Sequence, residues 1–113
     1  MPGWQPNWDD VAWDWGAANE AMNALRRAAD MLDQTAYERK RKADQATAEW
    51  RGVYREEFDE DLRGILTRAR DLARDFRDIA NRISRASGDA RREQDHREEE
   101  RERWWRQYWD EQE

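Results

Sequence analysis

Apolar residues recur between positions 11 and 50 in steps that alternate between four and three residues. The positions with this spacing are Val11, Trp15, Ala18, Met22, Leu25, Ala29, Leu32, Ala36, Arg39, Ala43, Ala46 and Trp50. Such spacing places the side chains in one stripe along a helix, as in a coiled-coil seam, and only Arg39 is polar. A strand would need alternation at every second residue, which this segment lacks. We expect a helix over about residues 9–50, N-capped by Asn7, Asp9 or Asp10.

The pattern restarts after Gly52 and predicts a second helix over about residues 54–90, joined to the first by a turn at 51–53. Gly52 is expected to cap the first helix, because glycine adopts a left-handed conformation at least cost. Two long helices joined in this way predict an all-α antiparallel hairpin, with Ala90 near Trp15. The side chains expected in its core are Trp15, Met22, Leu25, Leu32, Phe58, Leu62, Ile65, Leu72, Phe76, Ile79 and Ile83.

Both helices carry a second apolar stripe that cannot face the other helix of the same hairpin. Its members are Ala17, Ala21, Ala24, Ala28 and Met31 on the first helix, with Leu66, Ala73 and Ala80 on the second. Their small size would allow another helix to approach closely. We therefore expect two hairpins, identical or different, to pair into a four-helix bundle. The alternative is that these alanines are simply good helix formers on an exposed surface.

The two ends of the chain differ from the hairpin. Residues 1–8 contain both prolines and predict an irregular arm. Residues 91–113 form a charged tail that is either helical, with pairs such as Glu93 with Arg97, or partly disordered. Its last aromatic residues, which would share a helix face, are Trp104, Trp105, Tyr108 and Trp109. They would pack against a partner or against the N-terminal tryptophans, which are Trp4, Trp8, Trp13 and Trp15.

Composition narrows the possible functions. Of the 113 residues, 42% are charged and the net charge is −6, which predicts a single domain with a thin core and disfavours nucleic-acid binding. There is no cysteine, so disulfides and thiol chemistry are excluded. No segment has the length of a membrane span, and no basic region followed by an apolar run opens the chain. If the protein leaves the cell, we expect it not to use a standard N-terminal signal.

The sequence contains few candidate catalytic residues. The one histidine, His96, lies in a charge run, and neither Ser84 nor Ser87 has a candidate base and orienting group. There is no glycine-rich phosphate loop, and the carboxylates are mostly placed at helical spacing from arginines. We expect a protein that is not an enzyme and that holds no metal or cofactor.

A helical hairpin of this size with Trp50-Arg51-Gly52 between its helices resembles the WXG family of type VII secretion proteins, the ESAT-like small helical hairpins. The segment AANEAMNALRRAADML resembles their first helix. AEWRGVYREEFDEDL places Phe58 six residues after the glycine, as their second helix often does, and ASGDARREQDHR resembles the C-terminal helix of actinobacterial members. The resemblance covers roughly residues 9–95.

The resemblance implies a homodimeric or heterodimeric four-helix bundle with another WXG-type hairpin or with the targeting domain of a toxin. It further implies a protein that is cytoplasmic before export and is then secreted without a cleaved signal, as a substrate or as an export partner of an effector. Members combine the W-x-G turn with a Tyr-x-x-x-Asp/Glu export motif. No tyrosine here fits it, although Trp109 and Glu113 have the spacing. Either the partner supplies the motif or the system recognises another feature.

Two alternative functions remain at this stage. One is a plain structural coiled coil. The other is an envelope or membrane-surface scaffold in which the C-terminal aromatic residues lie at the headgroup interface. The tail carries six arginines against nine acidic residues, so anionic lipids would repel it and membrane binding is disfavoured.

Overall fold

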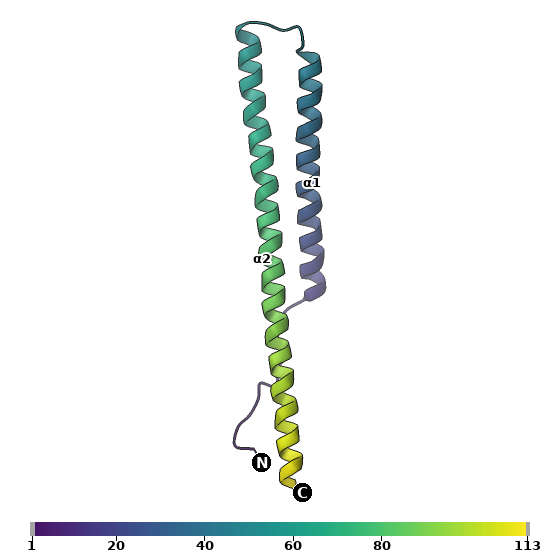
Figure 1. Cartoon of the computed structure of the whole chain (residues 1–113), viewed down its shortest axis with the longest axis vertical. Helices are drawn as coiled ribbons and strands as arrows, with labels where there is room; N and C mark the ends of the chain where they lie inside the picture. Colours follow the sequence, from purple (N-terminus) through teal and green to yellow (C-terminus); the bar gives the residue numbers. More distant parts are fainter. Residues whose placement is uncertain (1, 113) are drawn as a thin grey trace.

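In the computed structural model, which describes residues 2–112, the chain forms two helices, α1 (Trp15–Ala46) and α2 (Val53–Gln112). They lie antiparallel as a hairpin, and the whole molecule is about 92 Å long and 17 by 14 Å across (Figure 1). The expected all-α hairpin is therefore confirmed. Glu113, which completes the aromatic–acid spacing with Trp109, lies outside the described residues.

α1 is shorter than the apolar spacing predicted. The Asp14 carboxylate accepts a hydrogen bond from the Ala17 amide at 3.0 Å, so the N-cap is Asp14 and not Asn7, Asp9 or Asp10. At the other end, Thr47 is the C-cap, and its hydroxyl donates to the Ala43 carbonyl at 2.7 Å. The helix therefore spans residues 15–46 rather than 9–50.

The connection between the helices covers residues 47–52, which is longer than the expected turn at 51–53. Gly52 has a φ of 88°, and its carbonyl accepts a hydrogen bond from the Glu56 amide at 3.2 Å. It therefore caps the start of α2 and not the end of α1, which corrects the sequence-based expectation. Because Thr47 closes α1 without a left-handed residue, the left-handed conformation is needed only where the chain enters α2.

α2 continues through the expected boundary at residue 90 and through Ser87-Gly88-Asp89 without a break. The charged tail is thus helical as far as Gln112, the first of the two alternatives. Because α1 begins only at Trp15, the last part of α2 projects beyond it (Figure 1). We call residues 91–112 the α2 extension.

The seam of α1 follows the predicted stripe. Ala18 and Ala29 are buried, and the half-buried members are Trp15, Met22, Leu25 and Leu32. The predicted register, with Ala90 near Trp15, also agrees. The Trp15 indole donates a hydrogen bond to the Ser87 carbonyl at 3.0 Å, and the Arg91 guanidinium lies 4.3 Å from the Trp15 ring. Ser87 and Arg91 flank Ala90 in the sequence.

The seam of α2 differs from the prediction at every second position. Ala73 and Ala80, which were expected to face a partner, are fully buried within the hairpin, and Leu66 is half-buried. The residues just before them, Ile65, Leu72 and Ile79, were expected in the core but are 45%, 43% and 42% exposed. The expected core members that remain half-buried are Phe58, Leu62, Phe76 and Ile83. Alanine occupies the inner position because a methyl group lets the helix axes approach more closely.

Candidate interaction surfaces

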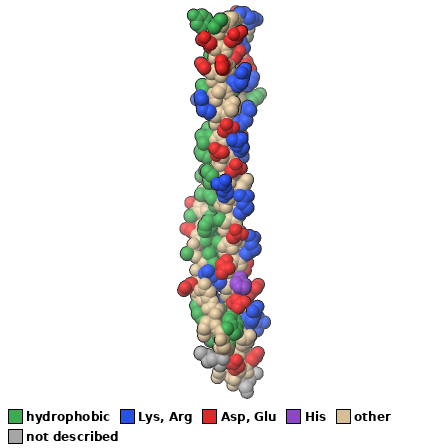
Figure 2. Space-filling model, turned by 90° about the vertical axis from the view of Figure 1, so that its left-hand side faces the viewer, with side chains coloured by type: hydrophobic (Ala, Val, Ile, Leu, Met, Phe, Trp, Pro, Cys, Tyr) green, Lys and Arg blue, Asp and Glu red, His purple; other side chains and the backbone are tan. Residues whose placement is uncertain are grey.

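One side of the hairpin displays a continuous set of apolar side chains, which we call the apolar face. It consists of Ala17, Ala21, Ala24, Ala28 and Met31 on α1 and Ile65, Leu72 and Ile79 on α2. Its central part is a groove of about 440 Å³ between the helices, where Ala28 and Met31 line one wall and Ile65 and Leu72 the other. Figure 2 shows hydrophobic side chains gathered in a band along one side of the rod and charged side chains along the other.

The α1 residues expected at a partner interface are mostly exposed in the single hairpin. Met31 is 67% exposed, and Ala17, Ala21 and Ala24 are exposed as well. On α2, the apolar side chains exposed beside them are Ile65, Leu72 and Ile79, whereas Leu66, Ala73 and Ala80 lie in the hairpin seam. An exposed apolar strip of this length on a highly charged chain is a candidate interaction surface.

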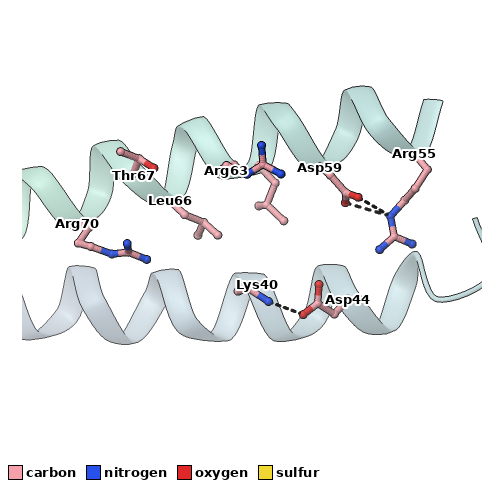
Figure 3. Close-up of a pocket in the computed structure, with 9 residues that line it drawn as sticks. Lys40, Asp44, Arg55, Asp59, Arg63, Leu66, Thr67 and Arg70 are labelled. Atoms are coloured by element: carbon pink, nitrogen blue, oxygen red, sulfur yellow. Dashed lines mark hydrogen bonds and ion pairs between the residues drawn. The ribbon is translucent and has the colours of Figure 1, made fainter. Parts of the chain in front are cut away.

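A polar pocket of about 310 Å³ lies near the turn, between the two helices (Figure 3). Lys40 pairs with Asp44 at 2.8 Å, and Arg55 pairs with Asp59 at 3.0 Å. Arg55 also donates to the Thr47 carbonyl, which ties the start of α2 to the end of α1. The ion pairs inside this pocket are one turn apart on the same helix, so they stabilise the individual helices and form no obvious ligand site.

The closed end of the hairpin exposes several apolar side chains. Trp50 is 47% exposed, and its ring lies edge-on to Phe58 with centroids 5.6 Å apart. Val53 and Tyr54 are 65% and 83% exposed. Trp50 therefore packs against Phe58 at the end of the hairpin, and about half of its surface stays exposed to another molecule.

The N-terminal arm, residues 2–14, runs along the α2 extension and is held by side chains of α2 (Figure 1). The Gln94 side chain accepts a hydrogen bond from the Val11 amide at 2.8 Å and donates to the Asp10 carboxylate at 3.0 Å. Gln94 is 7% exposed. Arg101 donates to the Asn7 and Asp9 carbonyls at 3.0 and 2.6 Å.

Ionic interactions reinforce this contact between the N-terminal arm and the α2 extension, which we call the clasp. Arg101 also forms an ion pair with Asp10 at 2.9 Å. Hydrogen bonds from Gln94 and Arg101 hold the pKa of Asp10 below its ordinary value. Arg97 donates to the Asp9 carbonyl at 3.1 Å and pairs with Glu93 at 3.0 Å, the expected helical pair. The arm therefore has its backbone carbonyls satisfied by cations and its carboxylate held by two donors.

Aromatic residues from both chain ends meet at the tip of the extension. Trp104 is 6% exposed, and its indole donates to the Trp4 carbonyl at 3.0 Å. The Trp8 ring stands edge-on to Trp104 at 5.3 Å, and Tyr108 stacks on Trp104 at 5.4 Å. Packing of the C-terminal aromatic residues against the N-terminal tryptophans, one of the expected arrangements, is thus present. Trp105 and Trp109 remain 46% and 60% exposed.

Sequence reasoning did not identify the residues that hold the arm. Ser87 accepts hydrogen bonds from both Trp13 and Trp15, and Gln94 and Arg101 sit in what reads as a solvated charge run. One signal was available: Ser87, Gln94 and Arg101 are spaced by seven and continue the column of Leu66, Ala73 and Ala80.

No group of three or more His, Cys, Asp or Glu side chains within residues 2–112 is arranged to hold a metal ion. Neither α1 nor α2, over the same residues, is apolar enough to cross a membrane. Comparison of the chain with protein-family models, with curated proteins and with solved structures finds no match.

Proposed function

We propose that this chain is a non-enzymatic interaction protein of the WXG type. It pairs through its apolar face with a second hairpin into a four-helix bundle and serves a type VII secretion system, as a secreted substrate or as the export partner of an effector. The observation that carries the proposal is the apolar face, which joins Met31 on α1 to Ile65 and Leu72 on α2.

The thin core of the single hairpin supports pairing. Within the two helices, the buried hydrophobic side chains are four alanines and Trp104, while Ile65, Leu72 and Ile79 keep two-fifths or more of their surface in water. Removing apolar surface from water contributes about 25 cal/mol per Å². A second hairpin on this face would bury the large side chains that the first leaves exposed.

The shapes on the two helices are complementary. In a two-fold pair, the contact of residue i with residue j is repeated as j with i. The alanine column of α1 in one hairpin can therefore receive the large side chains of Ile65, Leu72 and Ile79 from the other, and the reverse. Alternation of small and large side chains of this kind is what close helix packing requires.

The resemblance assigns the secretion role, and Trp50 provides its contact point. Trp50 lies at the closed end of the hairpin beside Gly52, with half of its ring exposed. This places a large aromatic side chain away from the apolar face, where secretion machinery can reach it in a paired hairpin.

Sedimentation of the full chain at micromolar concentration tests the pairing. We expect a dimer for the chain alone, or a heterodimer when it is co-expressed with a hairpin protein encoded beside it. Met31→Glu combined with Leu72→Glu should give a monomer. Tyr37→Glu is the matched control, because Tyr37 is 70% exposed, on α1, and lines a different pocket from the apolar groove.

Recovery of a monomer both alone and with that partner would reject the pairing. The secretion role has its own test in the host: Trp50→Ala should reduce export while the helix content stays unchanged. Export that is insensitive to Trp50→Ala would leave only a structural coiled coil.

A further inference from the structure

The tip of the α2 extension exposes three indoles side by side, which we call the indole surface: Trp8, Trp105 and Trp109. Trp8 comes from the arm and is 46% exposed, like Trp105, while Trp109 is 60% exposed. The Trp8 and Trp105 centroids are 6.2 Å apart, and those of Trp105 and Trp109 are 6.5 Å apart with ring planes inclined by only 25°. Both ends of the chain thus build one aromatic surface that the hairpin core does not use.

A groove of about 450 Å³ runs beside Trp105 and Trp109, and acidic side chains form part of its lining. They are Glu98, Glu102 and Asp110, and within the described part of the chain no cation pairs with Glu102 or Asp110. Of the two arginines in the lining, Arg101 is already neutralised by Asp10, and Arg106 offsets only one of the three carboxylates. The groove therefore combines indole faces with an excess of negative charge.

We propose that this groove docks an arginine-bearing segment of a partner protein. The face of an indole attracts a cation, and carboxylates at its edge add hydrogen bonds and charge. Arginine fits both, because its planar guanidinium stacks on aromatic rings and forms paired hydrogen bonds with carboxylates. The chain already uses this chemistry internally, where Arg91 lies 4.3 Å above the Trp15 ring.

The indole surface is separate from the apolar face. On α2, Ile65, Leu72 and Ile79 each precede a residue of the seam, whereas Trp105 follows the seam residue Trp104. Positions just before one seam column and just after the other flank a coiled-coil seam on opposite sides. A pair formed through the apolar face therefore leaves the groove open, so this inference stands or falls independently of the proposed pairing.

The indole N–H resonances of the ¹⁵N-labelled full chain report on the groove directly. Single Trp→Phe variants assign them. The probe is a short acetylated peptide containing Arg-Ala-Arg, and its control is the same peptide with citrulline, an uncharged isostere, in place of arginine. We expect the arginine peptide, at millimolar concentration, to shift Trp105 and Trp109. Trp50 is the internal control, because it is 47% exposed at the opposite end.

Substitutions test the indole face and the carboxylate separately. Trp109→Leu keeps an apolar side chain but removes the indole face, so the peptide should bind about two- to five-fold more weakly. Glu102→Gln should weaken binding by a similar factor of about two to five, and less at high salt. Glu38→Gln, on α1 and outside the groove, should leave binding unchanged.

Four outcomes would overturn the proposal. They are equal shifts from the citrulline peptide, equal shifts at Trp50, no shift at all, and broadening of Trp105 and Trp109 by phosphatidylcholine vesicles without a peptide effect. The last would assign the surface to lipid headgroups. Far-UV circular dichroism of each variant confirms that the helices are retained, so a weaker shift reports on the groove.

Discussion

Trp104 is the side chain on which the clasp between the arm and the α2 extension most depends. It is 6% exposed, contacts Trp8, Trp105 and Tyr108, and donates a hydrogen bond to the Trp4 carbonyl. We predict that Trp104→Ala releases the arm and loosens the extension while it leaves the paired part of the hairpin intact. The substitution should affect the extension and not the part of α2 that packs on α1, because none of these contacts involves α1.

The magnitude follows from the burial of the indole. A buried tryptophan removes about 150–250 Å² from water, which corresponds to about 4–6 kcal/mol. Truncation to alanine in a packed site costs about 3–5 kcal/mol, and the lost hydrogen bond to Trp4 is worth about 1 kcal/mol. Because each 1.4 kcal/mol is about a tenfold change in an equilibrium constant, the opening of the extension should become at least about a hundredfold more frequent.

Native-state hydrogen exchange measures this opening at individual amides. The amides of residues 98–112 should exchange at least about a hundredfold faster in Trp104→Ala, or lose their protection altogether, while those of α1 change little. Trp105→Ala is the matched control: its indole is half exposed, so the same arithmetic gives about 2–3 kcal/mol, and the acceleration should be clearly smaller than in Trp104→Ala. Unchanged exchange over residues 98–112, or equal acceleration in α1, would refute the idea that Trp104 holds a separate clasp.

Three further predictions concern the backbone, the seam and pH. Gly52→Ala should lower the free energy of unfolding by about 1–2 kcal/mol because of its φ of 88°, whereas Gly64→Ala, inside α2, should raise it by about 0.5–1 kcal/mol, both in urea titrations. Ala73→Leu should destabilise the hairpin by about 1–3 kcal/mol in the same assay, because Ala73 is fully buried. The folded-state pKa of Asp10 is lowered, so its contribution to arm docking is present above its ordinary value of 3.8 and is lost as the pH falls through the lowered pKa. The indole N–H signals of Trp4 and Trp8 should report this release on acidification, and Asp10→Asn should remove the step.

The sequence predicted the hairpin and the seam of α1 well for a simple reason. Along α1 the large apolar residues fall in the seam and the second column is mostly alanine, so the inner stripe is unambiguous. On α2 two adjacent columns are apolar, one with Ile65, Leu72 and Ile79 and the other with Leu66, Ala73 and Ala80. Hydrophobicity alone selects the larger residues, but close approach of two helices selects the smaller ones.

The spacing of apolar and charged residues could not predict where α1 begins or which groups the clasp joins. Val11 continues the apolar spacing although it lies in the extended arm, because the start of α1 is set by the Asp14 cap. Arg101 and Asp10 are 91 residues apart, and nothing in the charge run around Arg101 indicates that its partners are arm carbonyls. Such contacts depend on where the hairpin brings the two chain ends together.

The apolar face and the clasp lie on different parts of α2, and each covers apolar side chains that the other cannot reach. The face extends from Ala17 to Met31 and from Ile65 to Ile79, entirely within the region where α1 covers α2. Beyond Arg91, the α2 extension therefore has no part of α1 beside it, and it lies outside the face through which the proposed bundle would form. Most of the stability of a helix in a protein comes from tertiary packing of its apolar face, which α1 does not supply here. The arm supplies that packing within the same chain, so the extension, and the indole surface on it, should keep its structure in the monomer and in the pair alike.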